Sequence, residues 1–357
     1  MPVEIAVGRL RDLVEGPAHL GEVIAFGTVA VAPLETFLRG PSESVFQPRC
    51  LAADALAAIG EKEAHEALAR ALLDSSGREL PAALRFSEDA VVNRIATHLG
   101  ATGDRRFAGP LLEALRAHPF GECARALGRL GEKSAVPLLL GCLRDDFARE
   151  GAMDALESLG GTAVPELTDL LTTPSEGGTA VSQRASAATA LGRIRGSSEW
   201  PLLQALRDES LEVRVAAALA LCERGSRIRE QTVKILSEAL DSESVLLAEA
   251  AARTLAGAGE PAVARLLEVL GETPLTETDR RRRFAAVHLL GRLGNPLAVS
   301  ALGLTALDAD VLLRQAAAAA LGRIPDAPST KALAQFLDDP DALGETDGGS
   351  FSGRSTQ

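Results

Sequence analysis

Apolar residues recur at intervals of three and four along almost the whole chain, and glycine, proline and aspartate interrupt them at regular points. This period is typical of amphipathic helices. The pattern itself repeats: an Ala-rich helix, named helix A here, ends at a glycine, and a Leu-rich helix, named helix B, follows it. A pattern repeated in phase along the chain predicts a repeat array rather than a single compact core.

Glycine and proline mark the helix ends. Glycine takes the left-handed conformation at little cost, so it caps a helix well, and proline is tolerated in a first helical turn. We expect proline near the start of helix B at Pro33, Pro137 and Pro201. We expect glycine caps after helix A at Gly27, Gly60, Gly103, Gly131, Gly160, Gly225, Gly259 and Gly294. With Gly128 as the register mark, equivalent positions are 57, 100, 157, 192, 222, 256, 291 and 322, which indicates about ten units.

An arginine lies eight residues before many of these register positions. The set is Arg49, Arg149, Arg184, Arg214, Arg283 and Arg314. Aspartate closes many B helices, at Asp74, Asp145, Asp208, Asp241, Asp308 and Asp338. These residues predict a structural ladder of Asp–Arg contacts between units, with a row of anion sites as the alternative. Three units have Val92, Phe120 or Ala248 at the arginine position, and we expect those units to be less regular.

Segments such as R-A-S-A-A-T-A-L-G-R-I (184–194) resemble the HEAT-like repeats of the phycobilisome-lyase (E–Z) type over residues 17–339. The resemblance implies an all-α, right-handed α–α superhelix with A helices on the convex side and B helices on the concave side. We expect an N-terminal capping helix within 1–16, a single solenoid domain over 17–339 and a disordered acidic, Gly/Ser-rich tail over 340–357.

The composition of the chain limits the kinds of partner and the cell compartment that we expect. The net charge of −12, the single tryptophan and the lack of tyrosine argue against a nucleic-acid partner. The four cysteines have no paired spacing, which predicts reduced, buried thiols. The N-terminus lacks a signal-peptide pattern and the most apolar run, 23–34, is too short to span a bilayer, so we expect a cytoplasmic protein without membrane insertion. Arginine outnumbers lysine 33 to 4, which indicates a bacterial genome rich in GC.

The resemblance also extends to enzymes with this type of repeat, but the sequence contains few of the residues that their active sites need. A di-iron hydroxylase of this type implies several His–Glu pairs, whereas the chain has one, His65–Glu66. A HEAT-like glycosylase implies aromatic residues in a basic groove, and Trp200 is expected to be a core anchor. Motifs for nucleotide hydrolysis or nucleophilic catalysis are missing. We therefore expect no enzyme activity, no catalytic residue, no metal and no cofactor.

The leading hypothesis is a protein-interaction scaffold that binds another protein through the concave helix-B surface. The alternative is a phycobilin-lyase-like, tetrapyrrole-handling subunit, because such proteins lack a compact catalytic signature and arginines on helix B could anchor propionates. The sequence names neither the partner nor the oligomeric state. Candidate partner-binding residues are Glu35, Arg39, Glu66, Arg70, Glu113, Arg116, Glu166, Asp169, Arg207, Arg265, Arg280, Arg281 and Arg282.

Three segments interrupt the array. Residues 75–88 read as an insertion whose Leu80, Leu84 and Phe86 either fold back on the solenoid or offer an apolar docking site. Residues 172–179 read as a turn. The run Arg280–Arg283 opens a helix A, where cations oppose the helix dipole, and it suggests a third hypothesis, a receptor for an anionic ligand.

Overall fold

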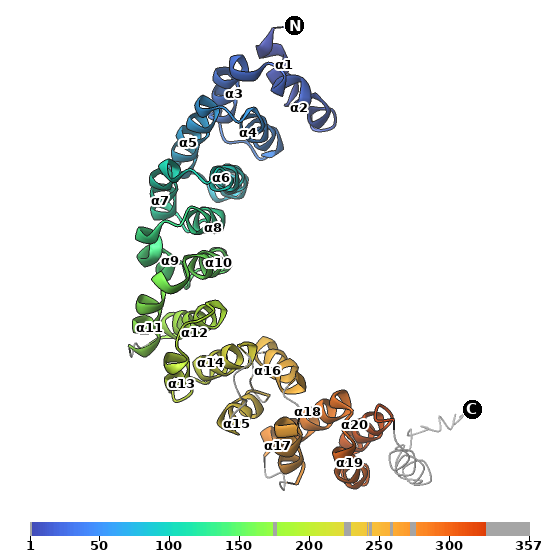
Figure 1. Cartoon of the computed structure of the whole chain (residues 1–357). Helices are drawn as coiled ribbons and strands as arrows, with labels where there is room; N and C mark the ends of the chain where they lie inside the picture. Colours follow the sequence, from blue (N-terminus) through green and yellow to red (C-terminus); the bar gives the residue numbers. More distant parts are fainter. Residues whose placement is uncertain are drawn as a thin grey trace, which may run out of the picture. The chain divides into compact units, whose positions relative to one another are not determined.

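The structure is a computed structural model that describes residues 2–173, 177–224, 230–240, 242, 245–257, 260–271 and 276–325. Within these residues the chain forms twenty α-helices and no strand (Figure 1). The expected all-α superhelical repeat is therefore confirmed. The predicted tail at 340–357 and the predicted residues Gly225, Gly259, Asp241 and Asp338 lie outside the described residues.

The chain divides into two compact units, Met1–Pro201 and Leu202–Gln357. In the first unit, α1 (Val3–Arg9) is shorter than the predicted capping helix. The A helices that follow are α2 (Gly16–Ile24), α4 (Gln47–Ile59), α6 (Ala82–Ala101), α8 (Gly121–Arg129), α10 (Arg149–Leu159) and α12 (Gly178–Arg193). The B helices are α3 (Val31–Leu38), α5 (Lys62–Ser76), α7 (Ala108–Ala117), α9 (Val136–Cys142) and α11 (Val164–Thr172).

The second unit has the same alternation, and α13 (Trp200–Ala205) spans the boundary between the units. Its A helices are α14 (Leu211–Glu223), α16 (Val245–Gly257), α18 (Glu277–Leu293) and α20 (Val311–Leu321). Its B helices are α15 (Glu230–Ala239), α17 (Glu260–Gly271) and α19 (Val299–Thr305). Within each unit, each A helix packs against the next A helix and B helices pack beside them, so the core of the unit is a layer between two rows.

The predicted orientation of the two rows is wrong in the first unit. Figure 1 shows the A helices α4 to α12 on the concave side of the arc of that unit, and the B helices α3 to α11 on the convex side. The physical reason is the size of the side chains between helices. A Cβ atom on Gly100 would lie 2.7 Å from Cβ of Ala126, and one on Gly128 would lie 2.5 Å from Cα of Ala155. Because A helices approach each other so closely, their row is the shorter one and takes the inside of the curve.

The predicted caps are largely confirmed. Gly27, Gly60, Gly103, Gly131, Gly160 and Gly294 all have positive φ. Gly60, for example, follows α4 with a φ of 71°, and its backbone N–H donates a hydrogen bond to the carbonyl of Leu56. Short 3-10 turns then lead into several B helices, at Gly27–Ala30, Arg105–Phe107, Lys133–Ala135, Gly160–Thr162 and Pro296–Ala298. Local sequence thus sets each A-to-B turn.

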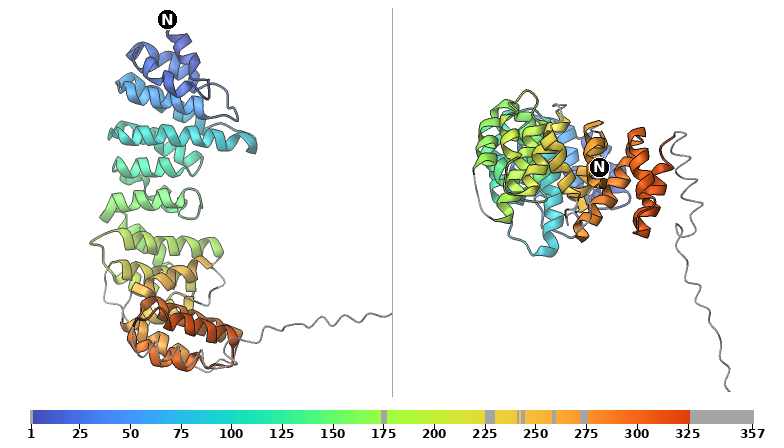
Figure 2. Two further views of the ribbon diagram at one scale, coloured as in Figure 1. Left: turned by 90° about the vertical axis from the view of Figure 1, so that its right-hand side faces the viewer. Right: turned by 90° about the horizontal axis from the view of Figure 1, so that it is seen from below.

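Two other expectations change. Residues 82–88 of the predicted insertion are the first turns of α6, which extends past its neighbours in Figure 2. Trp200 is 55% exposed, so its prediction as a core anchor is wrong. Among the described residues no helix is both long and apolar enough to cross a membrane.

Candidate functional site

The repeated arginines bind backbone carbonyl groups more often than they bind aspartate side chains. The Arg49 Nε donates to the carbonyl of Leu38 (2.8 Å) and the Arg149 Nε to that of Leu143 (2.9 Å). Arg214 and Arg314 bind the carbonyls of Asp208 and Asp308, each at 3.0 Å. The last carbonyl groups of a helix have no hydrogen-bond donor within that helix, and these guanidinium groups donate to carbonyls at the helix ends. The predicted Asp–Arg contact occurs at Arg283, which donates to the Asp308 carboxylate (2.9 Å), while Arg184 is buried in α12.

The units without this arginine fill its place with apolar side chains. Val92 in α6 and Phe120 before α8 are both buried. The side chain of Ala248 lies outside the described residues. The aspartates act mainly at the turns: Asp145 accepts the amides of Phe147 and Ala148 just before α10.

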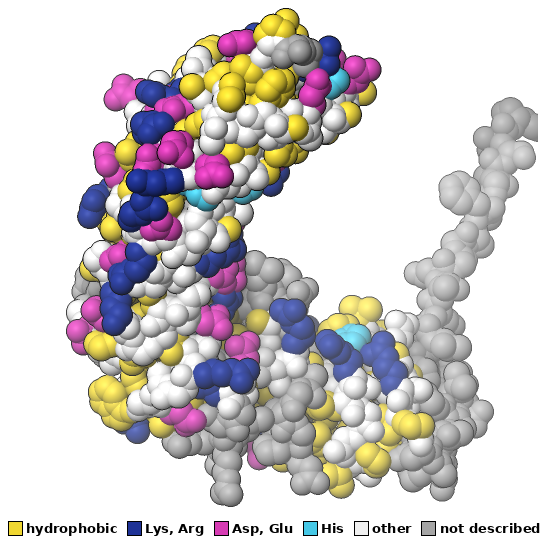
Figure 3. All heavy atoms as spheres, turned by 45° about the horizontal axis from the view of Figure 1, so that its top comes forward, with side chains coloured by type: hydrophobic (Ala, Val, Ile, Leu, Met, Phe, Trp, Pro, Cys, Tyr) yellow, Lys and Arg dark blue, Asp and Glu magenta, His cyan; other side chains and the backbone are white. Residues whose placement is uncertain are grey.

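The predicted partner-binding residues of the first unit lie on the convex row and are extensively paired. Arg70 binds Glu35 through two hydrogen bonds of 2.8 and 2.7 Å, and Arg39 lies within 3.6 Å of both Glu35 and Asp74. Glu66 pairs with Lys62 at 3.6 Å. The remaining members on this row are exposed: Glu113, Arg116, Glu166 and Asp169. Figure 3 shows acidic and basic side chains intermixed along this side, which is a mixed rather than a basic surface.

In the second unit the candidates are also mixed in charge. Arg207 is exposed just after α13, and Arg265 pairs with Glu268 at 2.7 Å. Arg280 and Arg281 at the start of α18 lie 3.6 and 3.9 Å from Glu277, and Arg282 is half-buried. A capping box of Thr276 and Asp279 offsets the unfavourable cations at this helix start.

The concave face of the first unit carries a row of ion pairs that sequence reasoning missed. Asp54 in α4 contacts His98 (2.6 Å) and Arg94 (3.5 Å) in α6. Asp154 in α10 joins Arg125 of α8 (2.7 Å) and Arg193 of α12 (3.2 Å). These pairs link consecutive A helices.

A sequence signal for this row exists. Three residues before each register position of the first unit, the otherwise Ala-rich A helices carry polar side chains: Asp54, Thr97, Arg125, Asp154 and Thr189. A polar residue at one fixed place in an apolar helix indicates an exposed stripe.

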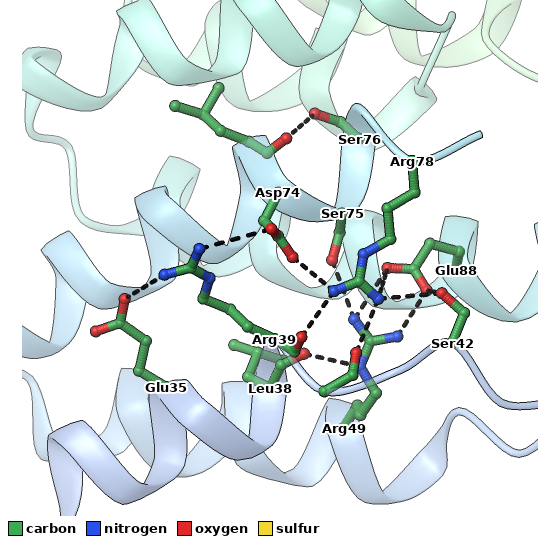
Figure 4. Close-up of polar contacts among 12 residues, drawn as sticks. Glu35, Leu38, Arg39, Ser42, Arg49, Asp74, Ser75, Ser76, Arg78 and Glu88 are labelled. Atoms are coloured by element: carbon green, nitrogen blue, oxygen red, sulfur yellow. Dashed lines mark hydrogen bonds and ion pairs between the residues drawn. The ribbon is translucent and has the colours of Figure 1, made fainter. Parts of the chain in front are cut away.

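A buried ionic cluster joins α3, α4, α5 and α6 (Figure 4). The Glu88 carboxylate accepts hydrogen bonds from Arg49 at 2.6 and 2.9 Å and from the Ser42 hydroxyl at 2.6 Å. Arg78 lies 3.5 Å from the same carboxylate. Burial acts to raise the pKa of Glu88, but the hydrogen bonds from Arg49, Ser42 and Ser75 and the charge of Arg49 hold the pKa below its usual value. Glu88 is therefore ionised at neutral pH.

The same cluster fixes the loop between α3 and α4. Arg78 donates to the carbonyls of Gly40 and Arg39, each at 2.8 Å, and to the Ser42 hydroxyl at 3.0 Å. The Ser87 hydroxyl donates to the carbonyl of Ser44. A pocket of about 340 Å³ borders this loop. On the other side of the loop, Phe46 meets the exposed Phe86 edge to face, with ring centroids 6.0 Å apart.

The cysteines are buried or half-buried, and burial raises the pKa of their thiols. All four are free. Burial raises the pKa of Cys123, and it raises that of Cys142 to about 11, so both stay protonated at neutral pH. In the part of the chain that the structure describes, no group of three or more His, Cys, Asp or Glu side chains could hold a metal ion.

Repeat families match four stretches of the chain. HEAT repeats match residues 199–281, and the PBS lyase HEAT-like repeat matches residues 48–74, 121–145 and 313–339. The chain thus contains HEAT repeats, and three of its stretches match the PBS lyase type.

Solved structures with a similar fold include importin and karyopherin solenoids. This HEAT-repeat protein is similar to importin beta in an ammonium sulfate condition, with a TM-score of 0.51 and 14% identity over 96% of this chain and 54% of that one. A Kap121p mutant gives a TM-score of 0.50 and 12% identity, over 95% of this chain and 44% of that one. The HEAT-repeat protein thus spans about half the length of these two, and at such identities the likeness shows the fold alone.

A structure of human deoxyhypusine hydroxylase in complex with glycerol is 21% identical over 85% of this chain and 98% of that one. Its TM-score of 0.29 carries no argument about activity. No curated protein matches the sequence of this HEAT-repeat protein.

Proposed function

We propose that this HEAT-repeat protein is a non-enzymatic scaffold that binds a partner protein along the concave A-helix face of its first unit. The row of charged side chains on consecutive A helices carries the proposal. Arg94 and Glu150 are at least half exposed on this face, and Asp154 is 40% exposed. Repeat solenoids use such extended concave surfaces for binding.

The ion pairs along this face also hold it ready for a partner. Asp154 fixes Arg125 and Arg193, so these long side chains lose little further freedom when a partner binds. Acidic and basic groups alternate along the row, which favours a partner segment with the complementary alternation.

A comparative pull-down tests the proposal. The wild type, a concave variant (Arg94→Glu with Glu150→Lys) and a convex variant (Glu113→Lys with Arg116→Glu) are used as baits in extract from the native organism. All four residues are exposed, so the variants are expected to fold, and circular dichroism checks that they do. We expect a specific protein to be recovered by the wild type and the convex variant and to be lost from the concave variant.

Two results would contradict the proposal. One is recovery that the concave variant retains and the convex variant loses, which places the partner on the other row. The other is the lack of any specific partner together with turnover in a broad substrate screen, which favours an enzyme.

The tetrapyrrole-handling alternative rests on the match to PBS lyase HEAT-like repeats. Of the arginines that could anchor propionates, Arg39, Arg70 and Arg265 pair with carboxylates, which leaves Arg116 and Arg207 as exposed candidates among the described residues. A shift in visible absorbance on adding a bilin, lost in Arg116→Ala with Arg207→Ala, would support this alternative over the scaffold.

A further inference from the structure

A second surface of the first unit, the loop pocket, has the features of a docking site. We define the loop pocket by Arg11, Leu13, Phe37, Glu43, Val45 and Pro48, which line a cavity of about 340 Å³ beside the loop between α3 and α4. Its walls combine the apolar side chains of Leu13, Phe37, Val45 and Pro48 with the charged Arg11 and Glu43, and Leu13 and Val45 remain exposed. A cavity of this size accepts one bulky apolar side chain of a partner.

The loop that borders the pocket also contacts α6 through an aromatic pair. Val45 lines the pocket, and the next residue, Phe46, stacks edge to face on Phe86. Phe86 is 75% exposed because it lies on the first turns of α6, which extend past the neighbouring helices in Figure 2. The loop and α6 thus each expose a large apolar side chain, Val45 and Phe86.

The buried cluster holds this surface in one conformation. Arg49 and Arg78 fix the loop carbonyls of Leu38, Arg39 and Gly40, and Glu88 joins both arginines (Figure 4). A buried ionic cluster stabilises a fold little in comparison with apolar packing, so its benefit lies in fixing the local geometry. A loop fixed in advance binds a partner at a smaller cost in conformational entropy.

The rim of the pocket bears two charges of opposite sign. The Arg11 guanidinium lies over the Phe37 ring, 5.3 Å from its centroid. Within the described residues neither Arg11 nor Glu43 has an ion-pair partner, although most of the arginines around them do. An exposed pair of opposite charges beside an apolar cavity complements a segment with the reversed pair.

We propose that the loop pocket docks a short segment of a partner protein. A bulky apolar side chain of that segment fills the cavity, an acidic residue on one side pairs with Arg11, and a basic residue on the other side pairs with Glu43. Phe86 covers the segment where it leaves the pocket. This site shares no residue with the concave face, so it is a second contact point for the scaffold and its test is independent of the first.

Selection from a displayed library of random dodecapeptides on the full-length protein tests the inference. We expect enriched peptides with one bulky apolar residue between an acidic and a basic residue. In fluorescence anisotropy, Arg11→Glu and Phe86→Ala should each weaken the binding of an enriched peptide about tenfold. Exchanging the acidic residue of the peptide for lysine should restore affinity for Arg11→Glu and lower it for the wild type.

One control variant and three contrary results make the test decisive. Arg144→Glu, after α9, is an exposed charge reversal far from the pocket in sequence and should leave affinity unchanged. Enriched peptides that lose affinity with Arg94→Glu and keep it with Arg11→Glu overturn the inference while the concave-face proposal stands. Failure to enrich any peptide overturns it as well, and so does a dimer, seen by sedimentation, that Phe86→Ala dissociates without an effect on peptide binding.

Discussion

At the scale of the residue, Glu88 has the most demanding environment in the first unit. Its carboxylate is buried and holds two arginines and a serine from three other segments. Removing the Glu88 charge leaves the buried Arg49 guanidinium without its carboxylate partner, which costs more than the intact cluster contributes.

Glu88→Gln should therefore lower the free energy of unfolding by about 3–5 kcal/mol. The substitution keeps the size of the side chain and removes its charge, so the loss is electrostatic. Urea unfolding followed by circular dichroism measures it. The matched control is Glu66→Gln, whose exposed pair with Lys62 contributes about 0–1 kcal/mol. Equal losses in the two variants would show that the cluster is energetically unimportant.

The difference between wild type and Glu88→Gln should depend on pH. The folded-state pKa of Glu88 lies below 4.5, so its stabilising effect is complete above that pH and is lost as the pH falls through the folded pKa. Unfolding curves between pH 7 and pH 3 should show a constant difference at the upper end that narrows below about pH 4.5. A difference that widens on acidification would contradict an ionised Glu88.

The sequence predicted the roles of some single residues and not of others. The glycine caps at Gly60 and Gly294 were predictable because a helix end and a left-handed residue are local properties. Glu88 was not, because it lies 39 residues from Arg49 and inside a segment that interrupts the repeat. The register therefore carried no information about their contact.

At the scale of the element, the close approach of α8 and α10 depends on Gly128. Gly128→Ala should lower stability by about 1–3 kcal/mol, because its Cβ would lie 2.5 Å from Cα of Ala155 and the helices must separate. Gly141→Ala in α9 has open space around the new methyl group and should be neutral or stabilise the helix by up to about 1 kcal/mol. Thermal unfolding of both variants compares them, and equal losses would mean that helix propensity, not contact, governs position 128.

The orientation of the rows was the main element-level error. The amphipathic period of an A or B helix identifies which side is buried, but both rows bury a side in the same core. Curvature follows instead from the distance between successive helices, which depends on pairs such as Gly100 with Ala126 that are far apart in the sequence. The start of α6 was likewise read as an insertion, since its length exceeds that of the neighbouring A helices.

At the scale of the molecule, a repeat array distributes its stability locally, since each unit contacts only its neighbours. Hydrogen exchange of the Gly128→Ala variant should show faster exchange in α8 and α10, a smaller change in α6 and α12, and none in α18 to α20. Mass spectrometry of peptides resolves these segments. Uniformly faster exchange along the whole chain would indicate that it unfolds as one cooperative body.

The Gly–Ala contact between successive A helices, called the joint here, also affects how such a chain can grow. Helix α8 carries both halves of that joint, since Ala126 faces Gly100 of the preceding A helix and Gly128 faces Ala155 of the following one. Residues 121–148, from the start of α8 to the residue before α10, therefore form a cassette that fits onto a copy of itself. Tandem duplication within the gene would lengthen the solenoid without the need for a new interface, so the length of the array can follow the size of whatever it binds.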